Sequence, residues 1–224
     1  MNLSLKRAKA ILPEILARLT IRRDSGAIDS TEALCNYVST RAALVAQKTL
    51  YSYLKTRMGI RYPLMFEDDA IISSINIAKM HIYAACLSDL AIFATSVALG
   101  AETVDDAARR KLALLCFERA LADNEEQAHK VAASFSIPEA VAAFERRLAF
   151  WNWQARLSGP DICSESPKAL FQWAPIAPEL KKYDREIVEN SIKFAWQEVR
   201  RKLEKRIDSA ALAAEAARGS QHPN

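Results

Sequence analysis

The placement of glycine is the feature that most constrains the fold of this chain. The sequence of 224 residues holds five glycines, and each stands where a long helical pattern ends, at Gly26, Gly59, Gly100, Gly159 and Gly219. Glycine costs about 1 kcal/mol relative to alanine inside a helix, but it is favoured in the left-handed position just beyond a helix end. This distribution predicts a series of helices separated by glycine stops.

Helix start signals agree with these stops. Asp29 and Glu32 have the spacing of a capping box, Thr103 precedes acidic first-turn residues, and Pro138 stands where a first helical turn tolerates proline. The patterns predict helices at residues 4–23, 30–58, 67–98, 103–122, 124–136, 138–157, 167–173 and 178–216. No segment alternates with period two, as a half-buried strand would. We therefore predict an all-α fold, a compact bundle of about seven or eight helices with a long C-terminal helix.

One segment reads as a real loop, "SGPDICSESP" at residues 158–167, and it is the candidate boundary within the chain. We expect a helical bundle at residues 1–157, and a loop with a short helix at 158–177. A long amphipathic helix at 178–216 then packs on the bundle or extends from it, and a disordered tail follows at 217–224.

Charge and cysteine content favour a cytoplasmic protein, with the inner membrane as a peripheral site. The formal net charge of +4 is too small to indicate nucleic acid, but residues 1–23 hold six basic residues against one acidic residue. The four cysteines lie far apart without a C-x-x-C pair, which predicts reduced, buried thiols: Cys35, Cys86, Cys116 and Cys163.

The most apolar stretch, residues 75–100, raises the question of a membrane span. Seven strongly apolar side chains in residues 82–99 favour insertion by about 2 to 4 kcal/mol together, while Asp89 near the middle costs about 2.5 to 3.5 kcal/mol. The two contributions to the free energy of insertion nearly cancel, and no second hydrophobic segment supports a membrane span. We expect a helix buried among other helices.

His81 in this stretch is the candidate catalytic residue. Ser74 and Ser88 lie seven residues from it, whereas side chains on one helix meet at three or four residues, so this helix cannot supply a catalytic triad alone. Either His81 is a hydrogen-bonded core residue, or it lines a pocket as a general base. In the second case Ser39 or Ser52, on the preceding helix, is the candidate nucleophile.

Other binding chemistry finds little support in the sequence. Glu126 and His129 have the E-x-x-H spacing of di-iron bundles, but the second copy that such sites need is absent, and we expect no metal and no cofactor. The glycine-rich phosphate loops and the G-x-S-x-G elbow are also missing. The stretch "YSYLKTRMGIRYP" mixes tyrosines with basic residues, as single-strand binders do, but basic residues also favour a helix C-terminus, so we do not expect nucleic acid.

The C-terminal helix carries the candidate partner-binding residues. Its apolar stripe consists of Ile192, Trp196, Val199, Leu203 and Ile207, and the adjoining "RRKLEKR" adds Arg200 and Arg201. Such a stripe either packs along the bundle or meets an external helix, and its basic flank suits an anionic membrane. We expect a protein partner or a homo-oligomer, with reversible contact to anionic lipid as the alternative.

Residues 47–94, which begin "QKTLYSYLKTRMGIRYP", resemble a poorly characterised family of alphaproteobacterial helical proteins, some of which are labelled esterases. The resemblance implies a bacterial cytoplasmic protein but does not assign any catalytic residue. Two functions therefore stay open. The first is a non-enzymatic interaction or adaptor protein that uses amphipathic basic helices. The second is an esterase-type hydrolase of small esters with His81 as its base.

Overall fold

The computed structural model describes residues 19, 26–100, 104–154 and 163–220. In this part the chain forms nine α-helices and one 3-10 helix and contains no strand, which confirms the all-α bundle. The expected helix at residues 4–23 lies outside the described residues apart from Leu19, which is buried.

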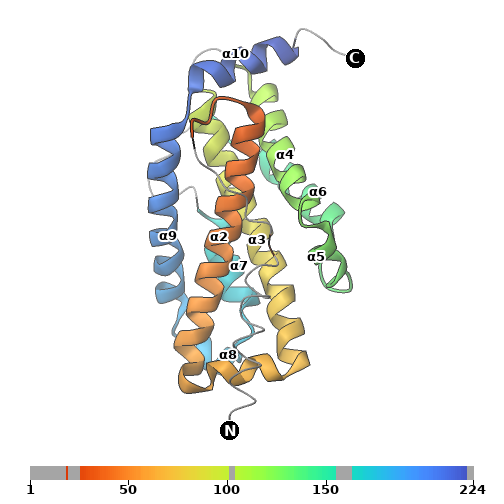
Figure 1. The fold of residues 1–224 in the computed structure, drawn as a ribbon, viewed down its shortest axis with the longest axis vertical. Coiled ribbons are helices and arrows are strands. Elements are labelled where there is room, and N and C mark those ends of the chain that lie inside the picture. The colour runs from red at the N-terminus through yellow and green to blue at the C-terminus, as the bar shows by residue number, and fades with distance from the viewer. Residues whose placement is uncertain (1–18, 20–25, 101–103, 155–162, 221–224) are drawn as a thin grey trace.

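Helix α3 (Asp69–Ala98) forms the centre of the bundle (Figure 1). It is joined to α2 (Thr31–Met58) by η1 (Gly59–Glu67) and also contacts α4 (Asp106–Ala122) and α7 (Glu165–Trp173). Among the described helices, α3 alone is long and apolar enough to cross a membrane, yet 72% of its apolar window is buried inside the protein. A helix surrounded by other helices is apolar on all sides, so packing accounts for its composition.

Polar side chains begin the helices close to the expected positions. Ser30 caps α2, Asp105 caps α4, and Ser136 caps α6 (Ile137–Ala149), where Pro138 stands in the first turn as predicted. The cap of α2 is therefore Ser30 and not Asp29, because the Ser30 hydroxyl accepts the hydrogen bond from the first turn. Thr103 lies outside the described residues.

Glycine closes two long helices as predicted. Gly59 and Gly100 follow α2 and α3 with φ angles of 53° and 50°, in the left-handed region that other residues avoid. Gly219 does not act as a stop, because α10 (Ser209–Ser220) includes it. The expected disordered tail therefore begins too early, since residues 217–220 are helical; residues 221–224 lie outside the described part.

The expected long helix at residues 178–216 is divided into α8 (Pro178–Lys181), α9 (Arg185–Arg206) and α10. Tertiary contacts account for both interruptions of the helix. The Asp184 carboxylate turns inward to Tyr53 and Arg57 on α2. At the second break the backbone of Ile28 donates to the Arg206 carbonyl at 2.8 Å and accepts from the Asp208 N–H at 2.9 Å. Ile207 is held extended between these two bonds, so α10 starts in a new direction across the end of the bundle (Figure 1).

The segment expected as a domain boundary lies partly in the core. Helix α7 begins at Glu165, packs against α3 and α9, and buries Ser166, Ala169 and Leu170. The helix expected at residues 124–136 is reduced to α5 (Glu125–His129), because the chain then turns and places Phe135 in the core. Helix α6 ends at Ala149, short of the expected residue 157.

Candidate functional site

His81 is held by neighbouring elements on three sides of its ring. Its Nε2 lies 2.8 Å from the carbonyl oxygen of Ser134, and its ring stacks on Trp173 of α7 with centroids 3.5 Å apart and planes 2° from parallel. Phe135 meets the same ring edge-on, with centroids 5.1 Å apart. Partial burial lowers the pKa of His81, although the bond to Ser134 opposes this. The side chain is therefore a neutral imidazole that donates from Nε2 and serves packing.

Among the described residues, no serine or cysteine side chain is hydrogen-bonded to His81 as the nucleophile of a hydrolase would be. Of the two serines expected as partners, Ser39 bonds to the hydroxyl of Tyr83 at 3.1 Å within the core, and Ser52 is exposed on α2. Within the described residues, the one hydrogen bond of His81 goes to a backbone carbonyl rather than to a serine or cysteine. A base and its nucleophile must lie within hydrogen-bond reach, so the described structure gives the esterase hypothesis no dyad.

A cavity of about 480 Å³ does open beside His81, between α3, α4 and α6. Its walls are mostly alanine and phenylalanine, including Phe117 and Phe144, whose stacked rings lie 4.3 Å apart. The volume is within the usual range for small-molecule sites, about 300 to 1,000 Å³. The polar groups that line it are mostly engaged elsewhere, however, as Arg147 shows.

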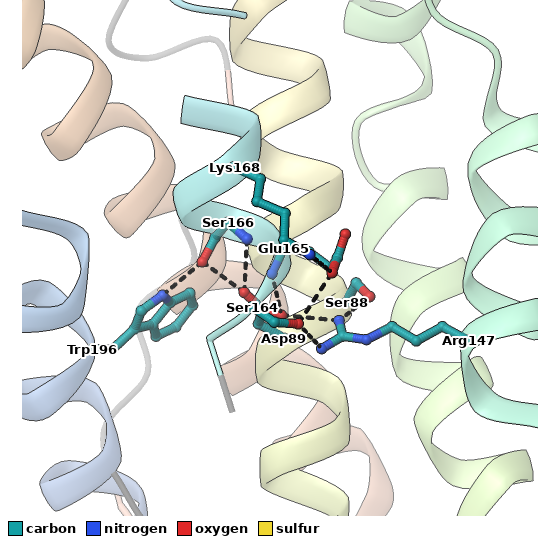
Figure 2. Close-up of polar contacts among 8 residues, drawn as sticks. All are labelled: Ser88, Asp89, Arg147, Ser164, Glu165, Ser166, Lys168 and Trp196. Atoms are coloured by element: carbon teal, nitrogen blue, oxygen red, sulfur yellow. Dashed lines mark hydrogen bonds and ion pairs between the residues drawn. The ribbon is translucent and has the colours of Figure 1, made fainter. Parts of the chain in front are cut away.

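Asp89 is the centre of a buried polar network (Figure 2). Its carboxylate is 1% exposed and accepts from the backbone N–H groups of Glu165 at 3.2 Å and Ser166 at 2.8 Å, at the start of α7. The Ser166 hydroxyl donates to it at 2.6 Å and accepts from the indole N–H of Trp196 at 3.0 Å. Asp89 thus caps α7 from α3, and the network reaches α9 through Trp196.

Arg147 of α6 completes this network. One guanidinium nitrogen lies 2.9 Å from Asp89 Oδ1 and donates to the Ser88 hydroxyl at 2.6 Å, and another donates to Ser164 at 3.1 Å. Burial raises the pKa of Asp89, while Arg147 and the Ser166 donors oppose that rise. Both carboxylate oxygens are occupied by donors, so neither is free to act as a base. The network links the four helices α3, α6, α7 and α9.

The apolar stripe expected to bind a partner faces inward instead. Ile192, Trp196, Val199 and Leu203 are buried on α9, which packs against α7 and α2, and the Tyr37 hydroxyl of α2 donates to the Val199 carbonyl at 2.7 Å. Ile207 is partly buried at the break before α10. The four buried residues are part of the core and offer no docking surface in the folded chain, so the prediction is wrong for these four.

The other residues singled out in the sequence divide between core and surface. Arg200 is partly buried, with its guanidinium 5.8 Å from the ring centroid of Phe93, whereas Arg201 is exposed. Tyr51 and Tyr53 are buried in α2, so they present no stacking surface for bases. His129 is exposed and lies 3.4 Å from Glu125. Among the described residues, no group of three or more His, Cys, Asp or Glu side chains could hold a metal ion.

A different apolar surface lies at the end of the bundle that carries η1 and α8 (Figure 1). Seven large hydrophobic side chains of the described residues are exposed, and five of them lie on η1, on α8, between α8 and α9, or at the start of α9. These five, which we call the end surface, are Ile60, Leu64, Leu180, Tyr183 and Ile187. Phe194 continues the same outer face of α9 two turns further along.

Contacts between α2 and α9 bring the parts of the end surface together. Asp184, next to Tyr183, is buried and accepts from the Tyr53 hydroxyl at 2.7 Å and from Arg57, which stands two residues before η1. Lys181 donates to the Phe171 and Gln172 carbonyls at the end of α7, at 2.9 and 3.0 Å. This surface has no signal in the sequence, because its side chains come from segments more than a hundred residues apart.

Comparison with known proteins adds no assignment. No protein-family model matches the sequence, no curated protein matches it, and no solved structure matches its fold.

Proposed function

We propose that this chain is a non-enzymatic helical interaction protein that docks on an anionic membrane surface through its end surface. The observation that carries the proposal is the gathering of five of the seven exposed large hydrophobic side chains at one end of the bundle. Soluble folds scatter such side chains singly, whereas a cluster marks a contact surface.

The apolar side chains of the end surface are exposed and can contact a lipid interface. Ile60 is 97% exposed at the start of η1, and Tyr183 is 82% exposed between α8 and α9. Moving one fully exposed Ile or Leu side chain out of water contributes at most about 1.5 to 3 kcal/mol. Tyrosine adds an amphipathic ring of the kind enriched at membrane interfaces. Several such side chains together favour a measurable, reversible association.

The charges around the end surface favour an anionic lipid as the occupant. Residues 55–61 and 178–187 contain six basic residues and three acidic ones, a net charge of +3. Arg57 and Lys181 are engaged within the protein, but Lys55, Arg61, Lys182 and Arg185 are exposed. Each basic residue near an anionic bilayer contributes about 1 kcal/mol, and salt screens the attraction. Acidic residues 67–69 follow at the far end of η1, and the charges of residues 178–187 balance, so the net positive charge lies on residues 55–61, where α2 meets η1.

Vesicle sedimentation tests the proposal directly. The full chain is mixed with vesicles of phosphatidylcholine, with or without phosphatidylglycerol, at low salt and at about tenfold higher salt, where the Debye length shrinks to a few Å. We expect sedimentation with the anionic vesicles at low salt and release at high salt.

Two variants locate the binding surface. The triple change Ile60→Ser, Leu180→Ser and Ile187→Ser removes the apolar anchors, and we expect it to stay in the supernatant. Phe150→Ser is the matched control, because Phe150 is 91% exposed but lies at the end of α6. Absence of binding by the unmodified protein at low salt refutes the proposal, as does equal loss in both variants.

A further inference from the structure

Two cysteines from neighbouring helices face each other in the core. Cys35 lies near the start of α2 and Cys116 lies in α4, 81 residues later, and their sulfur atoms are 2.8 Å apart. Both are free thiols. Ordinary contacts between carbon atoms measure about 3.5 to 4.0 Å, whereas a disulfide bond measures about 2.05 Å. The two thiols thus lie closer than ordinary packing places side chains.

We propose that Cys35 and Cys116 form a reversible redox pair, which hydrogen peroxide converts into a disulfide that joins α2 to α4. The pair is distinct from the end surface, and it does not depend on membrane docking. Cys35 is the thiol that reacts first with the peroxide, and Cys116 is the resolving thiol.

Access to the pair is one-sided. A cavity of about 290 Å³ is lined by Cys35 together with Glu32, Asn36, Arg119 and Asp123, and Cys116 does not line it. The Cys116 side chain is completely covered, whereas Cys35 keeps a small exposed fraction. A molecule as small as hydrogen peroxide therefore reaches the Cys35 sulfur first.

The electrostatic surroundings of the two sulfurs also favour Cys35 as the thiol that reacts first. The hydrogen bond with Cys116 lowers the pKa of Cys35, and the positive charge of Arg119 lowers it further, although burial and the negative charges of Glu215 and Asp123 oppose this. The same hydrogen bond, together with burial, raises the pKa of Cys116 well above its usual value. The thiolate is the nucleophilic form of cysteine, so the attacking group is Cys35 and Cys116 stays protonated beside it.

The reaction takes place in two balanced steps. The Cys35 thiolate attacks one oxygen of hydrogen peroxide; the S–O bond forms, the O–O bond breaks, and the leaving hydroxide takes up the proton that Cys35 had released, giving sulfenic acid and water. The Cys116 sulfur then attacks the Cys35 sulfur; the S–S bond forms, the S–O bond breaks, and the leaving hydroxide takes the Cys116 proton as a second water. Overall, two thiols and one peroxide give a disulfide and two waters.

The other two cysteines provide matched controls. Cys86 and Cys163 are also buried free thiols, but burial raises the pKa of each, and nearby Asp89 adds to this rise. Neither thiolate is favoured, so we expect both residues to stay reduced under the same treatment.

Peptide mapping of the full chain tests the pair. The folded protein is treated with hydrogen peroxide, remaining thiols are alkylated in denaturant, and the digest is analysed by mass spectrometry. We expect a cross-linked peptide pair containing Cys35 and Cys116, an intact mass lower by two hydrogen atoms, and loss of the cross-link after dithiothreitol. The oxidised protein also unfolds at a higher temperature, because the disulfide closes a long loop.

Substitutions separate the roles of the two thiols. Cys116→Ser leaves Cys35 without a resolving thiol, so we expect Cys35 to gain oxygen and no internal cross-link to form; Cys163→Ser keeps the 35–116 cross-link. If Cys116→Ser fails to fold, the map of the unmodified protein decides alone. Recovery of both residues as alkylated thiols, oxygen addition without a cross-link, or a cross-link through Cys86 or Cys163 overturns the proposal.

Discussion

Asp89 shows how one charged residue is accommodated in the most apolar helix of the chain. A buried carboxylate without partners is strongly destabilising. Here the start of α7 and the Arg147 guanidinium supply donors to both oxygens. The sequence could indicate that Asp89 needs a partner, but not which of the 31 basic residues provides it, because Arg147 reaches Asp89 only through the packing of α6 against the bundle.

Substitution of Asp89 tests this network. Asp89→Asn preserves the size of the side chain but leaves Arg147 without its counter-charge and points an amide group at hydrogen-bond donors. We expect the free energy of unfolding to fall by about 3 to 5 kcal/mol, the usual cost of removing one partner from a buried ion pair. Urea unfolding measures it. The control Glu125→Gln removes an exposed carboxylate that pairs with His129 and should change stability by less than about 0.5 kcal/mol.

The burial of His81 predicts how the stability of the fold depends on pH. Burial lowers the pKa of His81 from its ordinary value of 6.5, so near pH 6 the unfolded chain binds more protons at this position than the folded chain. Stability therefore falls as the pH drops from about 7 to about 5.5. We expect His81→Gln to show a smaller fall, measured by urea unfolding across this range, whereas the exposed His129→Gln retains the full fall. Parallel curves for His81→Gln and the unmodified chain would contradict the assignment.

Helix α9 carries two apolar faces with different roles. Ile192 is completely buried, whereas Ile187 is exposed on the end surface of the same helix. We expect Ile192→Ala to lower the free energy of unfolding by about 2 to 5 kcal/mol, because it leaves a cavity in the core. Ile187→Ala should change it by less than about 0.5 kcal/mol. Chemical denaturation compares the two; equal effects would mean that the faces are misassigned.

The stripe of α9 also shows what periodicity can and cannot predict. The spacing of Ile192, Trp196, Val199 and Leu203 correctly identified one apolar face of a helix, but a periodic face looks the same whether the chain's own core or a partner covers it. Helix ends marked by local chemistry, such as those at Pro138 and Gly59, can be predicted from the sequence. The breaks at Asp184 and Ile207 were missed, because they depend on contacts with Tyr53 and Ile28.

The C-terminal half of the chain completes the core of the N-terminal half. Helix α7 lies between α3 and α9, and the Asp89 network joins α3, α6, α7 and α9. The segment expected to separate a bundle from an appended helix therefore contributes to the centre of the described structure. Loop composition predicted a boundary because glycine, proline and serine mark turns, but they do not show whether the helix that follows is buried.

Truncation tests the integration of the C-terminal half. A chain that ends after Tyr183 loses five buried side chains of α9: Val188, Ile192, Trp196, Val199 and Leu203. Each contributes about 1.5 to 3 kcal/mol when fully buried, so their joint loss is comparable to the whole stability of a typical domain, about 5 to 15 kcal/mol. We expect this chain to aggregate or to lack a cooperative unfolding transition in circular dichroism.

A second truncation, after Asp208, provides the control because it keeps α9 and removes α10. It loses the buried Leu212, the bond from the Thr31 N–H to Glu215 at 2.8 Å, and the bond from Ser209 to the Val97 carbonyl at 3.0 Å. These contacts lie at one end of the bundle, so we expect a folded chain that unfolds cooperatively at a lower temperature. If the chain ending after Tyr183 instead unfolds cooperatively like the full protein, α9 is an appendage rather than part of the core. The apolar stripe of α9 would then be a candidate partner-binding surface in the full chain.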